Sequence, residues 1–120
     1  MTTILFTVND KMFEATLTEN ATTQAFIEQL PLELTMKDLN ANEKYANLNQ
    51  TLPTQSEQVE FIENGDFMLY GDNTIVLFYE DFTTPYSYTR LGKVNNSKNL
   101  KRDLGQGNAV VRAELKDNNI

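Results

Sequence analysis

The residues best suited to binding chemistry stand in two segments, an arginine among tyrosines and a loop rich in amides. Tyr86, Tyr88 and Arg90 alternate along the first segment, so on a strand their side chains would share one face. Arg90 could present its fork of donors to a carboxylate or carbonyl group of a ligand. The competing interpretation is a surface ion pair beside stacked tyrosines. The acidic candidates for that pair are Glu80, Asp66 and Asp72.

The second segment is the polar stretch Asp38–Tyr45, which carries Asn40, Asn42, Glu43 and Tyr45. Amides and a carboxylate on a loop can recognise a polar ligand. Asparagine side chains in turns also bond to the local backbone and hold a loop in place. Both interpretations are open from the sequence.

Together these segments predict a ligand-binding groove. Met36, Tyr70, Tyr88 and Arg90 would line the groove, and the Asn40–Tyr45 loop would form its rim. A small molecule or an extended peptide would fit such a site, because tyrosine combines an apolar ring with a hydroxyl that seeks a partner.

Several kinds of chemistry lack their residues here. The chain has no His, Cys or Trp, so it offers no thiolate nucleophile and no Cys- or His-based metal site. Glu80 and Asp81 are adjacent and would face opposite ways on a strand. Gly105-Gln106-Gly107 is not followed by a helix, as a phosphate-binding loop would be. We therefore predict no catalytic residue, no metal and no cofactor.

Charge and hydropathy limit the partners. The net charge of −7 and the absence of a Lys/Arg stripe argue against nucleic acid. No apolar run approaches the length of about 18 residues that a membrane span needs. The first ten residues carry no signal-peptide pattern, and the chain lacks cysteine, so we expect a cytoplasmic protein. The oligomeric state is not indicated.

The centre of the chain must position the candidate residues. Phe67–Tyr70 and Thr74–Tyr79 are strand-like runs separated by Gly71-Asp72-Asn73, which predicts a hairpin. The second run, TIVLFY, is apolar at nearly every position, which indicates a strand covered on both faces. A third run, Tyr86–Val94, follows a Thr-Thr-Pro turn, so we expect a three-strand antiparallel meander.

The remaining elements flank this centre. The predicted elements are strands at Ile4–Val8, Met12–Leu17, Pro31–Leu39 and Ala109–Leu115, a helix from Asn20 or Thr22 to about Leu30, and a helix near Ser97–Leu104. Asn40–Gln58 reads as a long polar loop with anchoring apolar residues. The layout predicts a single, mainly β domain over residues 1–120 with its core at about 4–115. It favours a small closed barrel whose open ends are covered by helices.

Three blocks of the sequence resemble the small bacterial cyclophilin-like domain family. The blocks are LPLELTMKDLNANEKYANL (Leu30–Leu48), GDFMLYGDNTIVLFY (Gly65–Tyr79) and TPYSYTRLGKV (Thr84–Val94). The resemblance implies a closed cyclophilin-like barrel of about eight strands with two short capping helices. It implies little about activity, because a shared fold does not transfer function.

Prolyl isomerases of the cyclophilin superfamily offer one comparison. Gly65-Asp66-Phe67 is similar to the Gly-Asp-Phe strand of those enzymes, where a catalytic arginine precedes the triplet by about ten residues. The corresponding region here, Thr54–Phe61, contains no arginine or lysine. We therefore expect a non-catalytic binding module. The alternatives are a weak or diverged prolyl isomerase, with Arg90 in place of the missing arginine, and a protein-interaction subunit.

Overall fold

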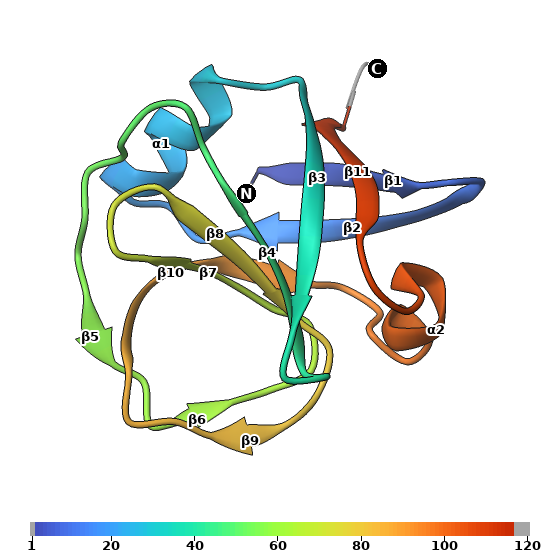
Figure 1. The fold of residues 1–120 in the computed structure, drawn as a ribbon. Helices are drawn as coiled ribbons and strands as arrows, with labels where there is room; N and C mark the ends of the chain where they lie inside the picture. Colours follow the sequence, from blue (N-terminus) through green and yellow to red (C-terminus); the bar gives the residue numbers. More distant parts are fainter. Residues whose placement is uncertain (1, 117–120) are drawn as a thin grey trace.

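Eight antiparallel strands close into a barrel in the computed structural model, which describes residues 2–116 (Figure 1). The barrel strands are β1 (Thr3–Val8), β2 (Lys11–Leu17), β3 (Leu32–Leu39), β4 (Glu43–Asn47), β7 (Asp66–Tyr70), β8 (Thr74–Phe78), β10 (Ser87–Val94) and β11 (Ala109–Leu115). Their order around the barrel is β2-β1-β11-β3-β4-β8-β7-β10, and β10 pairs with β2 to close it. The fold class and the closed barrel expected from the sequence are confirmed.

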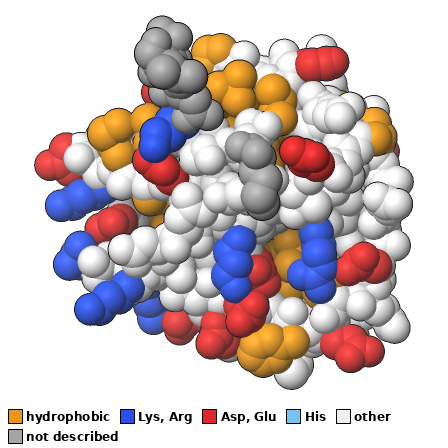
Figure 2. Space-filling model, turned by 180° about the vertical axis from the view of Figure 1, so that it is seen from behind, with side chains coloured by type: hydrophobic (Ala, Val, Ile, Leu, Met, Phe, Trp, Pro, Cys, Tyr) orange, Lys and Arg blue, Asp and Glu red, His pale blue; other side chains and the backbone are white. Residues whose placement is uncertain are grey.

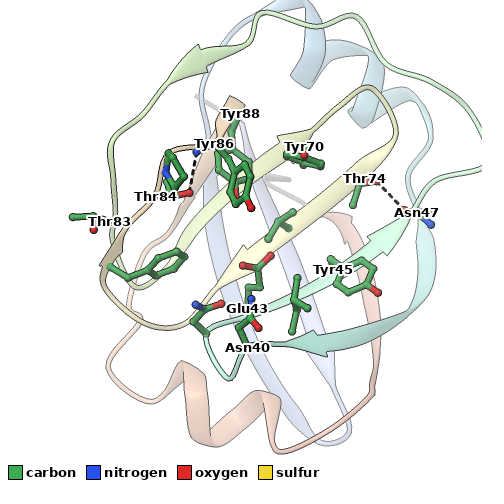
Figure 3. A pocket seen from close by; sticks show the side chains of 15 residues that line it. Asn40, Glu43, Tyr45, Asn47, Tyr70, Thr74, Thr83, Thr84, Tyr86 and Tyr88 are labelled. Atoms are coloured by element: carbon green, nitrogen blue, oxygen red, sulfur yellow. Dashed lines mark hydrogen bonds between the residues drawn. The ribbon is translucent and has the colours of Figure 1, made fainter.

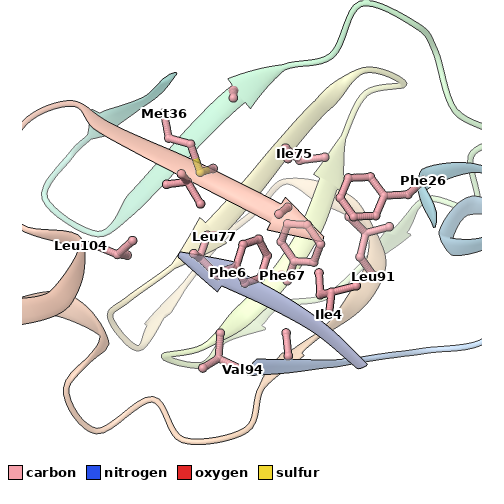
Figure 4. Close-up of a cluster of buried hydrophobic side chains, with 14 of the residues drawn as sticks. Ile4, Phe6, Phe26, Met36, Phe67, Ile75, Leu77, Leu91, Val94 and Leu104 are labelled. Atoms are coloured by element: carbon pink, nitrogen blue, oxygen red, sulfur yellow. The ribbon is translucent and has the colours of Figure 1, made fainter. Parts of the chain in front are cut away.

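Alternation along the strands fills the barrel with apolar side chains. Phe6, Phe67, Ile75, Leu77 and Leu91 point inward and are at most 1% exposed (Figure 4). Successive side chains on a strand face opposite sides of a sheet, so each barrel strand contributes every second residue to this core.

Two helices cover the barrel ends (Figure 1). α1 (Ala21–Glu28) begins at Asn20, whose side chain accepts a hydrogen bond from the Thr23 backbone, while the Thr23 hydroxyl oxygen accepts one from the Asn20 backbone. This reciprocal cap selects Asn20 over Thr22 as the start of the helix. α1 buries Phe26, and α2 (Leu100–Leu104) buries Leu100 and Leu104. α2 begins three residues later than the predicted start near Ser97.

The barrel closes at a position that only glycine can occupy. Gly92 on β10 pairs with Leu17 on β2, and a Cβ atom added to Gly92 would lie 2.3 Å from the backbone oxygen of Thr16. The pairing of β10 with β7 also shifts register between Arg90 and Gly92. A bulge and a close backbone approach thus bring β10 from β7 to β2.

The TIVLFY run is covered on both faces, as predicted. Ile75 and Leu77 belong to the barrel core, whereas Val76 and Phe78 belong to a second buried cluster outside the barrel. The preceding turn places Gly71 at φ +63, so the hairpin reverses at the glycine, as expected.

The predicted meander is wrong in its third strand. β7 pairs with β8, but β10 pairs with β7 rather than with β8. The free edge of β8 is occupied by β4, so β10 must return to the other edge of β7. The connection from β8 to β10 therefore crosses the outside of the barrel.

The predicted loop Asn40–Gln58 is also wrong in part. It contains β4 and the short strand β5 (Glu57–Gln58), which extends the sheet beyond β10. The sequence of β4, EKYAN, has no β-branched residue and two charged ones. Its pattern therefore does not indicate a strand. Two further short strands, β6 (Phe61–Ile62) and β9 (Phe82–Thr83), form a separate pair that the sequence did not indicate.

The surface carries charges of both signs. In the view from behind, Lys and Arg side chains are interspersed with Asp and Glu (Figure 2). Several form exposed pairs, such as Lys93 with Glu63 at 2.8 Å and Lys101 with Glu80 at 3.3 Å. Within residues 2–116, no helix has the length and hydropathy of a membrane span.

Candidate functional site

A pocket lies on the outer face of the sheet, over strands β4 and β8. Glu43, Tyr45 and Asn47 on β4 are opposite Phe78, Val76 and Thr74 on β8. Directly opposed residues in an antiparallel pair share a face. This is the face that carries Val76 and Phe78, away from the barrel core.

The segment that crosses outside the barrel forms the opposite wall of the pocket (Figure 3). It runs from β9 through Thr84 and Pro85 to Tyr88 on β10. The cavity has a volume of about 510 Å³, within the range of small-molecule sites. Its lining residues are Leu39, Asn40, Asn42, Glu43, Tyr45, Asn47, Tyr70, Thr74, Val76, Phe82, Thr83, Thr84, Pro85, Tyr86 and Tyr88.

Tyrosines make one side of the pocket a continuous aromatic wall. The ring of Tyr70 lies 5.6 Å from that of Tyr88 and 6.1 Å from that of Tyr86, the second pair edge to face. Tyr88 is only 4% exposed, whereas Tyr70 and Tyr86 are 47% and 58% exposed. Tyr88 is therefore fixed in the outer apolar cluster, and the other two rings are open to a ligand or partner.

The β3–β4 turn forms the rim opposite the tyrosines. Asn40 and Ala41 have φ values of +56 and +55, and the Asn42 backbone donates to the Leu39 carbonyl. Asparagine tolerates this left-handed conformation better than most residues, so Asn40 has a structural role in the turn. The backbone N–H of Tyr79 donates to the Asn42 carbonyl at 3.0 Å, which fixes the turn to the end of β8.

Glu43 is a buried carboxyl in the wall of this pocket. Its residue is 8% exposed, and Figure 3 shows its side chain directed into the cavity. Burial, together with the nearby charge of Asp38, raises the pKa of Glu43 to about 7. Neither a hydrogen bond nor a salt bridge to this carboxyl is found among residues 2–116. At neutral pH the group is therefore poised between its neutral and charged forms.

Two more polar side chains, those of Asn42 and Tyr88, line the pocket with Glu43. The side-chain oxygen of Asn42 is buried and has no hydrogen-bond partner within the described chain. Burial, followed by the charge of Glu43, raises the pKa of Tyr88 to about 12, so its hydroxyl keeps its proton at neutral pH. Glu43 and Tyr88 line the same cavity (Figure 3).

Lys44, the next residue on β4, faces the other way. It is opposite Leu77, a core residue, and is 0% exposed. Its ammonium group donates to the Gly107 carbonyl at 2.6 Å and pairs with Asp38 at 3.2 Å. The Tyr79 hydroxyl donates to the same Asp38 oxygen at 2.5 Å.

The pKa of Asp38 reflects this fully bonded arrangement. Burial alone would raise the pKa of Asp38, but hydrogen bonds from Tyr79 and Lys44 outweigh it and lower the pKa below its ordinary value. Lys44 thus holds the β3–β4 pair and the loop before β11 together, and it does not reach the pocket.

Six of the eight predicted ligand-binding residues meet at the pocket. They are Asn40, Asn42, Glu43, Tyr45, Tyr70 and Tyr88. Met36 does not line it, because alternation along β3 points this side chain into the barrel core, where it is 1% exposed (Figure 4).

Arg90 is also outside the pocket. It follows Tyr88 by two residues but pairs through its Nε atom with Glu57 of β5 at 2.8 Å. Both side chains of the pair are about half exposed, at 46% and 55%. The ion-pair interpretation is confirmed for Arg90, but its partner is Glu57 rather than any of the three acids predicted.

The lining residues of the crossing segment lie in a part of the chain that the sequence described poorly. Tyr86 was recognised only as a neighbour of Arg90, and Thr83–Pro85 only as a turn. The Thr-Thr-Pro-Tyr run was the available signal, because an aromatic residue beside a proline turn is poorly suited to a core. No cluster of three or more His, Cys, Asp or Glu residues able to hold a metal ion occurs in residues 2–116.

Comparisons with known proteins identify the family. A family model described as the cyclophilin-like family matches residues 6–116. Among solved structures, a hypothetical protein from Archaeoglobus fulgidus, determined in solution, is similar with a TM-score of 0.70 at 20% identity. The match covers 96% of this chain and 95% of that protein, and at this identity it shows the fold alone. No curated protein sequence matches the chain.

Proposed function

The chain belongs to the cyclophilin-like family, and we propose that it is a non-catalytic binding module whose ligand occupies the pocket between β4 and the Thr83–Tyr88 segment. The observation that carries the proposal is a cavity of about 510 Å³ that combines aromatic walls with buried polar groups lacking partners within residues 2–116. Convergent polar groups in an otherwise apolar cavity are typical of ligand sites. The ligand is a small molecule or an extended peptide, and the proposed location is the cytoplasm.

The lining residues favour binding over catalysis. No Lys or Arg is among the residues that line the cavity in the described part of the chain. A prolyl isomerase of the cyclophilin superfamily needs a cation over the prolyl amide, and Arg90 points its guanidinium toward Glu57 instead. The diverged isomerase is therefore the second candidate. A protease-coupled assay on an Ala-Pro peptide would establish it if a rate above background vanished in Arg90→Ala.

Amide spectra of the labelled protein test the proposed function. Titration with a fragment library and with proline-containing peptides should shift the amides of Asn42, Tyr45 and Tyr88. Tyr86→Ala should weaken such binding about threefold to tenfold, because it removes one exposed aromatic wall. Met12→Ala is the matched control, since Met12 is 61% exposed and lies outside the pocket. Shifts confined to residues away from the pocket would contradict the proposal.

An interaction subunit without a ligand makes a different prediction. Tyr70 and Tyr86 are exposed and pack edge to face, so a partner protein could cover them. In that case Tyr86→Ala would abolish capture of the partner, and no fragment or short peptide would shift the pocket amides.

A further inference from the structure

Two acceptor groups on the pocket wall have no hydrogen-bond donor as a partner within residues 2–116. Glu43 is 8% exposed, carries its carboxyl into the cavity and has no hydrogen-bond or salt-bridge partner within residues 2–116. The side-chain oxygen of Asn42, on the same rim, is buried and also lacks a partner. Buried polar groups in native proteins are bonded as a rule, so each exception calls for an explanation. A ligand with N–H donors would satisfy the Glu43 carboxyl, and it would reach the Asn42 oxygen once that side chain rotates.

The aromatic surroundings favour a positive charge on that ligand. The rings of Tyr70 and Tyr88 lie 5.6 Å apart, and Phe82 also lines the cavity. The faces of aromatic rings carry partial negative charge and attract cations, most strongly where water is excluded. No Lys or Arg among the described residues lines this cavity, so nothing on its walls competes for the carboxylate.

The charge of the whole protein acts in the same direction. The chain has a net charge of −7, which raises the local concentration of cations and disfavours anions. An anionic or strongly polar neutral ligand would leave Glu43 without a compensating charge, at a cost typical of buried unpaired groups.

We propose that the pocket binds a primary alkylammonium group, with the ammonium on the Glu43 carboxylate, beside the Asn42 side chain, and the alkyl chain along the tyrosines. The inference rests on the proposed binding function and names its ligand class. The same chemistry is offered by a free aliphatic amine and by the side chain of a lysine in an extended peptide.

Three small probes of equal chain length test the charge and the donors separately. In amide titrations, n-butylammonium should shift Asn42, Tyr45 and Tyr88, and n-butanol should bind at least about tenfold more weakly, the factor expected for one bond to a charged group. n-Butyltrimethylammonium keeps the charge but has no N–H donor, so it should also bind more weakly than n-butylammonium.

Two variants connect the effect to the named residues. Glu43→Gln should lower the affinity for n-butylammonium about tenfold or more and leave that for n-butanol unchanged. Asn42→Ala removes the neighbouring amide dipole and should lower the same affinity by a smaller factor. Circular dichroism and the amide spectrum establish that each variant is folded. Because neither side chain has a partner inside the described fold, both variants are expected to fold.

The outcomes separate this inference from the proposed function. Equal binding of n-butanol and n-butylammonium, or an affinity unchanged in Glu43→Gln, would overturn the ammonium assignment while the pocket still bound a ligand. Tighter binding of the quaternary probe would overturn the role of the N–H donors. If neither these probes nor the fragment and peptide libraries shift the pocket, the binding function itself fails. A lysine-containing peptide should then be compared with n-butylammonium and with the same peptide carrying norleucine in place of lysine. If the lysine peptide binds more tightly than both, the ammonium group comes from a peptide.

Discussion

Glu43 and Lys44 are neighbours on β4, and both are almost completely buried, but they lie on opposite faces of the sheet. Lys44 faces the barrel and has a carboxylate, a carbonyl and an aromatic ring around its ammonium group. Glu43 faces the pocket and has no such partner among residues 2–116, and its pKa is raised to about 7. A buried charge that stabilises a fold is paired with groups of the same protein. A buried charge that lacks such a pair marks a place where a ligand could supply the missing group.

The largest expected effect is on the barrel side of this pair. Lys44→Ala should destabilise the protein by about 3–5 kcal/mol, because it empties a fully buried position and leaves the Gly107 carbonyl without its donor. It also leaves Asp38 with the Tyr79 hydroxyl as its one side-chain donor within residues 2–116. Urea denaturation measures the loss. The control is Lys93→Ala, which breaks an exposed pair with Glu63 and should cost about 1 kcal/mol or less. Equal midpoints for the two variants would show that Lys44 is not a structural charge.

Leu77→Ala removes the core residue opposite Lys44. Leu77 is 0% exposed inside the barrel, so the substitution should cost about 2–5 kcal/mol, the usual result of a large-to-small core change. Val76→Ala, on the pocket face of the same strand, should cost less, since a smaller side chain is lost and the cavity adjoins it. A denaturation midpoint of Leu77→Ala within error of the wild type would undermine the two-sided burial of β8.

Glu43 should make stability depend on pH in a recognisable direction. Its pKa is raised from 4.5 to about 7 by folding, so between these values the folded state holds a proton that the unfolded state has released. The stability of the wild type should therefore fall as pH rises through this window, by about 1–2 kcal/mol once solvent screening in the open pocket is included. Glu43→Gln should remove this slope and be the more stable protein at pH 8. Parallel pH profiles for the two proteins would contradict the burial of an unpartnered carboxyl.

The smallest loss of stability is expected from a substitution in the turn that joins β7 and β8. Gly71 has φ +63 and open space where a Cβ would lie, so Gly71→Val should cost about 1–3 kcal/mol through backbone strain alone. Gly71→Asn should cost less, because asparagine tolerates this conformation. Amide shifts should reach the pocket through Tyr70 and Thr74. Equal stability of the two variants would show that the turn is not strained.

The sequence predicted the fold where apolar alternation or turn residues were strong. The TIVLFY run predicted a strand buried on both faces and Gly71 predicted the turn, and both agree with the structure. The helix cap was predicted at Asn20 or Thr22, and the structure places it at Asn20. β4 was missed because a strand that buries a lysine and a glutamate has no apolar pattern to recognise. The burial of Lys44 depends on hydrogen-bond partners far away in the sequence, such as the Gly107 carbonyl. The residues around β4 in the sequence do not reveal such partners.

The candidate site was predictable in its residue types and less so in its geometry. Tyr88 and the β3–β4 rim were assigned to one groove and lie together. Arg90 was assigned to that groove by simple alternation. Its position depends instead on β5, a strand of two residues that brings Glu57 beside it. Met36 was misassigned although the pattern of β3 was informative. It shares the apolar face of Leu32 and Leu34, which packs in the barrel core.

The most direct test is the titration of the Glu43 carboxyl itself, followed by carbon-detected NMR and assigned by comparison with Glu43→Gln. In the free protein the midpoint should lie near 7, because no partner within the described residues compensates burial. Saturation with n-butylammonium should move the midpoint downward, since the charged form gains a partner. A midpoint near 4.5 in the free protein, the ordinary value for a solvated glutamate, would contradict the contrast with Lys44 on which the binding site rests.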